Sequence, residues 1–197
     1  MRIATLLFLF CAIGTRLHAA PATTPLEVWG LQPWWDNSTW QSALGASAPP
    51  TTSENTAPAP ILLDRILFWN ATLGSDGLLV HTREWPAKWW ELLEAAEKVR
   101  VPIIPVLALT DEKDFAPLFG SDAHMARAHK SALWLYDSAQ ADGLQLDVSI
   151  PHDASEAQLY AFRQWLIALK AQLSKRDARA TLNLAWRGEY PTQWLDK

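Results

Sequence analysis

Residues 142–151 read DGLQLDVSIP, and this stretch decides how the chain is expected to fold. From residue 144 to residue 150, aliphatic side chains occupy the even positions, and Gln145, Asp147 and Ser149 occupy the odd ones. Successive side chains of a β-strand point to opposite faces, so the aliphatic set would face a layer of helices and the polar set would face the interior of a barrel. Burying three polar groups in a line is costly unless they bond each other or a ligand. The pattern therefore predicts a buried strand with a candidate site on one face.

Strand-like and helix-like segments alternate on both sides of this stretch. The strands are expected at residues 26–31, 61–70, 101–109, 144–150 and 179–186, and the helices at 86–100, 122–136 and 155–173. Such alternation predicts a parallel sheet with helices outside, either an open doubly wound sheet or a β/α barrel. No Gly-rich phosphate loop follows a strand, which argues against nucleotide binding. We count about five β/α units where a complete barrel has eight, so the predicted fold is α/β, a partial TIM-type barrel.

The first residues have the pattern of an export signal. Arg2 precedes a short apolar run at 6–13, which is too short to span a bilayer that takes roughly 20 residues. Cleavage after Ala22 is expected, and the protein is predicted to be secreted or periplasmic. Cys11 is the chain's single cysteine, so the mature chain would contain no disulfide.

Composition divides the remaining chain and limits its partners. We expect a first strand and turn at 23–44, a Pro/Ala/Thr-rich loop at 45–60 and a β/α barrel-like domain at 61–197. Removing residues 1–22 takes Arg2 and Arg16 but no acidic residue, so the formal charge changes from −4 to −6. An acidic chain without a basic run predicts no nucleic-acid partner and no membrane insertion of the mature chain. The histidines are scattered, so neither a metal site nor a cofactor is expected.

The segment at 142–151 resembles the fourth-strand signature of glycoside hydrolase family 18, D-G-x-D-x-D-x-E, in which the glutamate is the acid. Residues 64–77 and 101–109 resemble the second and third strands of that family, and the resemblance extends over approximately residues 61 to 186. A less characterised bacterial family of barrel-like proteins with a similar Leu-Asp strand is a second possible relative. Family 18 implies a chitinase-like barrel that cleaves amino-sugar polysaccharides, with the substrate's N-acetyl group as nucleophile.

The match at the catalytic motif is incomplete. The resemblance puts Asp142 and Asp147 at the first and third aspartates, whereas Gln145 replaces the middle aspartate and Ser149 the glutamate. A serine hydroxyl does not offer a proton near neutral pH, so this mechanism predicts an inactive, glycan-binding protein. The alternatives are a working hydrolase with a displaced acid, such as Asp147 or Glu189, and a non-enzymatic scaffold or fragment. An open sheet edge would favour self-association in the last case.

Tryptophan is unusually frequent, with 12 residues, and its rings serve either a core or sugar stacking. Trp29, Trp69 and Trp186 fall near the expected strand ends, so they are the candidate substrate-binding aromatics, together with Asn70. Tryptophans within the expected helices are assigned to packing; these are Trp89, Trp134 and Trp165.

Overall fold

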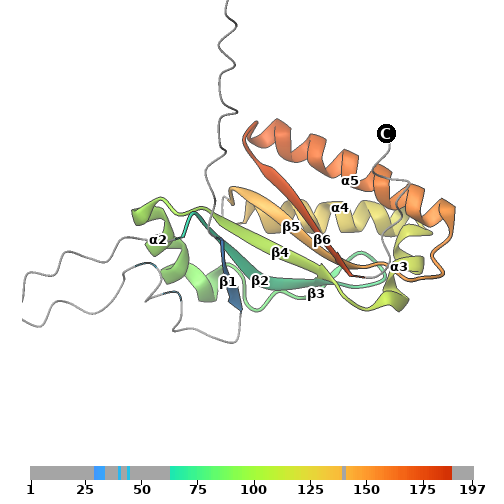
Figure 1. The fold of residues 1–197 in the computed structure, drawn as a ribbon, viewed down its shortest axis with the longest axis horizontal. Helices are drawn as coiled ribbons and strands as arrows, with labels where there is room; N and C mark the ends of the chain where they lie inside the picture. The colour runs from blue at the N-terminus through green and yellow to red at the C-terminus, as the bar shows by residue number, and fades with distance from the viewer. Residues whose placement is uncertain (1–28, 34–39, 41–43, 45–62, 139–140, 188–197) are drawn as a thin grey trace, which may run out of the picture.

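The computed structural model describes residues 29–33, 40, 44, 63–138 and 141–187, in which a curved sheet forms the centre of the fold. The strands are β1 (Trp29–Pro33), β2 (Arg65–Leu73), β3 (Leu79–His81), β4 (Ile103–Leu109), β5 (Gly143–Ser149) and β6 (Thr181–Arg187). The order is β1-β2-β4-β5-β6 with parallel neighbours, and β3 pairs antiparallel with the end of β2 (Figure 1).

Helices follow the parallel strands and pack on one face of this sheet. They are η1 (Ala87–Trp89), α2 (Trp90–Val99), α3 (Glu112–Phe119), α4 (Asp122–Asp137) and α5 (Glu156–Arg176). The even positions of β5 are buried in one apolar cluster with side chains of all these helices. The described part of the chain is thus a half-barrel with helices outside, which confirms the predicted fold class (Figure 1).

Aromatic rings form two contact groups in this core. Phe68 of β2 stacks on Trp85 at 5.1 Å and contacts Trp89 at 4.4 Å, which fixes the start of α2 against the sheet. Phe119 of α3 and Phe162 of α5 lie 4.8 Å apart between centroids, and Trp165 is buried beside them. Buried rings contribute large apolar areas, so these contacts stabilise the helix layer.

The turn after β2 is held against α4 by two hydrogen bonds. Arg127 Nε donates to the Asp76 carbonyl at 2.7 Å, and Ser131 Oγ donates to the Gly77 carbonyl at 2.9 Å. Gly77 has φ of 82°, and a Cβ there would collide with the backbone of His124. Only glycine allows both the turn and this close approach.

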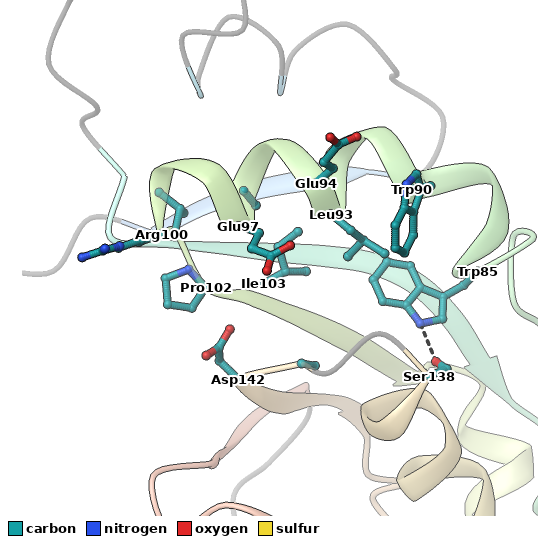
Figure 2. A pocket seen from close by; sticks show the side chains of 13 residues that line it. Trp85, Trp90, Leu93, Glu94, Glu97, Arg100, Pro102, Ile103, Ser138 and Asp142 are labelled. Atoms are coloured by element: carbon teal, nitrogen blue, oxygen red, sulfur yellow. Dashed lines mark hydrogen bonds between the residues drawn. The ribbon is translucent and has the colours of Figure 1, made fainter.

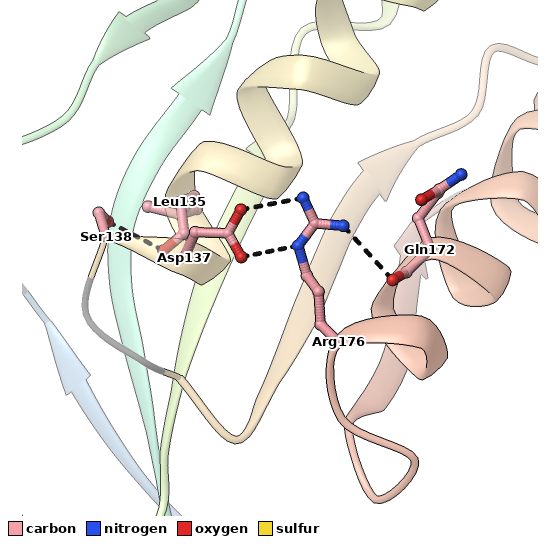
Figure 3. A network of polar contacts seen from close by, with 5 residues as sticks. All are labelled: Leu135, Asp137, Ser138, Gln172 and Arg176. Atoms are coloured by element: carbon pink, nitrogen blue, oxygen red, sulfur yellow. Dashed lines mark hydrogen bonds and ion pairs between the residues drawn. The ribbon is translucent and has the colours of Figure 1, made fainter.

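Polar contacts define the ends of α4 and α5. A capping box begins α5, because Ser155 Oγ accepts from Gln158 N at 3.3 Å and Gln158 Oε1 accepts from Ser155 N at 2.9 Å. At the other end of α5, the Arg176 guanidinium binds both Asp137 carboxylate oxygens at 2.7 and 3.0 Å (Figure 3). This pair joins the C-terminal ends of the two helices.

Several boundaries differ from the sequence prediction. β2 runs from Arg65 to Leu73 rather than over 61–70, because it continues past an irregularity into pairing with β3 and β4. The helix α3 was not predicted; Asp111 caps it and Pro117 lies inside it. Ser121 caps α4, since its hydroxyl accepts from His124 N.

Two further details concern single residues. Pro105 lies inside the central strand β4, although proline is unfavourable there because it has no N–H to donate. Pro102, just before this strand, accepts a backbone hydrogen bond from Ile66 at 2.9 Å. Trp89 and Trp165 are buried as expected, whereas Trp134 is 44% exposed on α4, so assigning it to packing was wrong.

The proposed signal at 1–22, the loop at 45–60 and the tail from 188 lie outside the described residues. Within the described part, no helix combines the length and apolarity needed to cross a bilayer.

Candidate functional site

β5 presents its polar residues on the face of the sheet that the helices do not cover. Leu144, Leu146 and Val148 belong to the helix-side core, so the alternate residues Gln145, Asp147 and Ser149 face the inside of the half-barrel. Asp147 is 7% and Ser149 is 6% exposed, and Gln145 is partly buried. The alternation in residues 144–150 therefore has the structural meaning that the sequence predicts.

Small residues flank Asp147 on both neighbouring strands. Asp147 pairs with Ala108 of β4 and with Ala185 of β6, and Ala108 pairs in turn with Thr72 of β2. Paired residues of parallel strands point to the same face at a spacing of about 4.8 Å. The carboxylate is therefore the largest polar group in a row of small side chains, near the carboxyl ends of the strands, where β/α barrels place their sites.

The adjacent row of paired residues, two positions nearer the amino ends of β4, β5 and β6, combines an aromatic ring with two amides. Trp69 of β2 pairs with Val106, Val106 with Gln145, and Gln145 with Asn183 of β6. Asn183 Nδ2 is buried, and it has no hydrogen-bond partner among the described residues. An unsatisfied buried donor costs about 1–3 kcal/mol, so this amide offers a hydrogen bond that a ligand could accept.

Sequence reasoning missed Asn183, although a signal was present. Residues 181–186 read TLNLAW, which repeats the alternation of β5 with Thr181 and Asn183 at inward positions. Applying the same period-two rule to this strand would have placed both side chains on the inner face.

Asp142 is not brought together with the other motif residues. It precedes β5 at the amino end, so five residues at about 3.3 Å each separate it from Asp147. Desolvation raises the pKa of Asp142 above its ordinary value, opposed by a hydrogen bond from the Ile103 backbone and by the charge of Arg65. Asp142 lies on a groove at the opposite end of the sheet.

The candidate aromatic residues also separate. Trp69 lies on the inner face with Gln145. Trp186 pairs with Val148, a core residue, so it extends from the helix-side face and is 43% exposed. Trp29 begins β1, but its side chain, that of Asn70 and the whole of Glu189 lie outside the described part.

The small number of carboxylates limits the chemistry of the inner face. Over the described inward positions of β4, β5 and β6, Asp147 is the single acidic side chain. Ser149 occupies the end of β5, where a general acid would be required by the resemblance. The described residues contain no group of three potential metal ligands. The arrangement can bind polar ring compounds by an aromatic face, amides and one carboxylate.

Fold and site together define a class: an α/β half-barrel with a polar inner face at the carboxyl ends of parallel strands. No protein-family model and no curated protein matches the sequence. Solved structures do match, and their fold is that of glycoside hydrolase family 18 barrels, which confirms the resemblance at the level of fold.

A chitinase from Bacteroides thetaiotaomicron has a TM-score of 0.58 at 14% identity, and the match covers 80% of this chain and 45% of that one. A family 18 chitinase from Cycas revoluta, solved with allosamidin and with (GlcNAc)3, has a TM-score of 0.55 at 15% identity over 85% of this chain and 51% of its own. The spore cortex-lytic enzyme SleL from Bacillus cereus has a TM-score of 0.55 at 12% identity and matches over 34% of its length. The chain thus spans about half of these enzymes or less, and the likeness is one of fold.

Proposed function

We propose that this protein binds an amino-sugar glycan on the inner face of the half-barrel without hydrolysing it. The observation that carries the proposal is Ser149 at the end of β5, where the inner face presents a hydroxyl instead of a carboxylic acid. A hydroxyl cannot protonate a leaving glycosidic oxygen near neutral pH. The Cycas revoluta enzyme of the same fold was solved with (GlcNAc)3, which supports the ligand class.

Trp69 and Asn183 provide the binding chemistry. The Trp69 ring suits the apolar face of a sugar, and the Asn183 Nδ2 donor has no protein partner among the described residues. An N-acetyl oxygen or a hydroxyl would accept this hydrogen bond and remove the cost of the buried donor. Asp147, in the adjoining row, would accept hydrogen bonds from sugar hydroxyls.

Binding is tested by titrating the mature chain with N-acetylglucosamine oligomers in a calorimeter, beside Asn183→Ala and the outer-face control Trp134→Ala. Asn183→Ala is expected to weaken binding about fivefold to tenfold, because a ligand hydrogen bond of about 1 kcal/mol is lost. Its folding stability should not fall, since the deleted donor is unsatisfied. Unchanged affinity in Asn183→Ala would contradict the assignment of the inner face.

Hydrolysis is measured in the same samples as release of reducing ends. We expect none above background. Release that disappears in Asp147→Asn would replace the proposal with a hydrolase in which Asp147 is the displaced acid.

Export is a separate part of the proposal. The sequence of residues 1–22 supports it, and amino-terminal sequencing of the protein from the cell envelope or medium tests it. A mature terminus at Thr23 is expected, whereas an intact Met1 in the cytoplasm would contradict export.

A further inference from the structure

A groove lies between α2 and the described residues Ser138, Ala141 and Asp142, beside the amino ends of β4 and β5 and away from the inner-face site. Its volume is about 480 Å³, which lies within the roughly 300–1,000 Å³ of small-molecule sites. Trp85, Trp90 and Leu93 line one end, and Glu97, Pro102 and Asp142 line the other (Figure 2).

The aromatic end of the groove is open to a ligand. Trp90 is 65% exposed and lines the groove together with Trp85 and Leu93. Trp85 beneath it is 4% exposed and is fixed by a hydrogen bond from its Nε1 to Ser138 Oγ at 2.9 Å (Figure 2). The exposed Trp90 ring therefore offers an apolar face to a ligand at this end of the groove.

The other end is acidic. Figure 2 shows the carboxylates of Glu97 and Asp142 on the groove side, whereas the Arg100 guanidinium points away from it. The Glu97 carboxylate has no hydrogen bond or ion pair with any described residue. Glu94 on the rim differs, because its carboxylate bonds Lys98 at 2.9 Å. The groove thus joins an aromatic face to a carboxylate that has no partner in the described chain.

We propose that this groove is a second binding site, which takes a cationic amino sugar such as glucosamine in a deacetylated glycan. One sugar ring of this glycan stacks on Trp90, and the ammonium group of a further glucosamine along the glycan binds the carboxylates of Glu97 and Asp142 at the other end. A charge-assisted hydrogen bond is stronger than a neutral one, which favours an ammonium group at these carboxylates. The volume favours a ring-bearing ligand over a single lysine side chain, which would leave most of the groove empty.

The site is independent of the inner face. It lies on the helix side and at the amino ends of the strands, whereas Asn183 lies inside the half-barrel. The two proposals can therefore fail separately: Asn183→Ala would leave binding in the groove unchanged, and groove variants would leave binding of N-acetylated oligomers unchanged.

The test is calorimetric titration of the mature chain with an oligomer of glucosamine and with its N-acetylated counterpart of equal length. Trp90→Ala is expected to weaken glucosamine binding about tenfold, and Glu97→Gln about fivefold or more, with affinity falling as salt screens the charges. Trp134→Ala, at another exposed helix tryptophan, and Glu91→Gln, at an exposed carboxylate of α2 that does not line the groove, are the matched controls and should bind as the parent does.

Three outcomes would overturn the proposal. One is glucosamine binding that Trp90→Ala and Glu97→Gln leave unchanged. Another is an affinity for the N-acetylated oligomer that depends on Trp90 and equals the affinity for the glucosamine oligomer, which would contradict a role for charge. The third is oligolysine binding with the predicted dependence on both residues while glucosamine does not bind, which would identify a basic peptide as the occupant.

Discussion

Gly143 begins β5 directly beside Thr181, which begins β6. A Cβ at position 143 would collide with Thr181 Oγ1 and come within 2.8 Å of the Thr181 carbonyl oxygen. Gly143→Ala is therefore expected to lower the free energy of unfolding by roughly 1–3 kcal/mol, as overpacking does, measured by urea denaturation. Thr181→Ala removes a buried hydroxyl without a partner among the described residues and should relieve part of this loss in the double variant. Strict additivity of the two changes would contradict the clash.

Asp142 gives a prediction for pH dependence at the same scale. Burial raises its pKa, so the folded chain holds this proton more tightly than the unfolded chain does. Ionisation of Asp142 therefore lowers the free energy of unfolding. The loss develops as pH rises from about 4 through the raised folded pKa, and it then stays constant. Asp142→Asn should be at least as stable as the parent at about pH 7, and the advantage should vanish near pH 3, in thermal unfolding followed at both values. If Asp142→Asn were less stable than the parent at pH 7 alone, the predicted sign of the effect would be contradicted.

At the scale of elements, the Arg176–Asp137 pair joins α5 to the end of α4 (Figure 3). Asp137 stands at a helix C-terminus, where the helix dipole disfavours a negative charge, and Arg176 offsets this. A double-mutant cycle of Arg176→Ala with Asp137→Asn should give a coupling of about 0.5–1 kcal/mol, because the pair is bidentate but partly exposed. The single-contact pair Glu94–Lys98 within α2 is the matched control, with a smaller expected coupling. Equal coupling energies for the two pairs would contradict a contribution from the bidentate geometry of Arg176.

Elements were predicted best where local chemistry repeats. The helix α5 is predictable from the sequence, because the capping box at Ser155 and the apolar spacing after it are local signals. In contrast, α3 escaped prediction: it is short, contains Pro117, and is held by Phe115 and Phe119 packing on Phe162 of a distant helix. β3 also depends on a partner, since its three residues pair with the end of β2.

At the scale of the whole molecule, the curved sheet separates two surfaces of different chemistry. The inner face carries Trp69, Asp147 and Asn183, and the groove on the helix side carries Trp90 and Glu97. Both combine an aromatic ring with polar groups, and both are expected to bind sugars, neutral on the inner face and cationic in the groove. The motif residues Asp142 and Asp147 belong to different surfaces. Asp142 lies at the amino end of β5, and Asp147 lies near its carboxyl end.

The sequence by itself determined the α/β class, the inward face of β5 and the absence of an acid at Ser149, because strand alternation and side-chain chemistry are local properties. Only the tertiary structure decided which side chains meet. The register of β5 with β6 placed Asn183 beside Gln145, and the arrangement of α2 beside Ser138, Ala141 and Asp142 formed the groove at Trp90. These contacts join residues far apart in the chain, and they follow from register and helix packing, for which no local pattern codes.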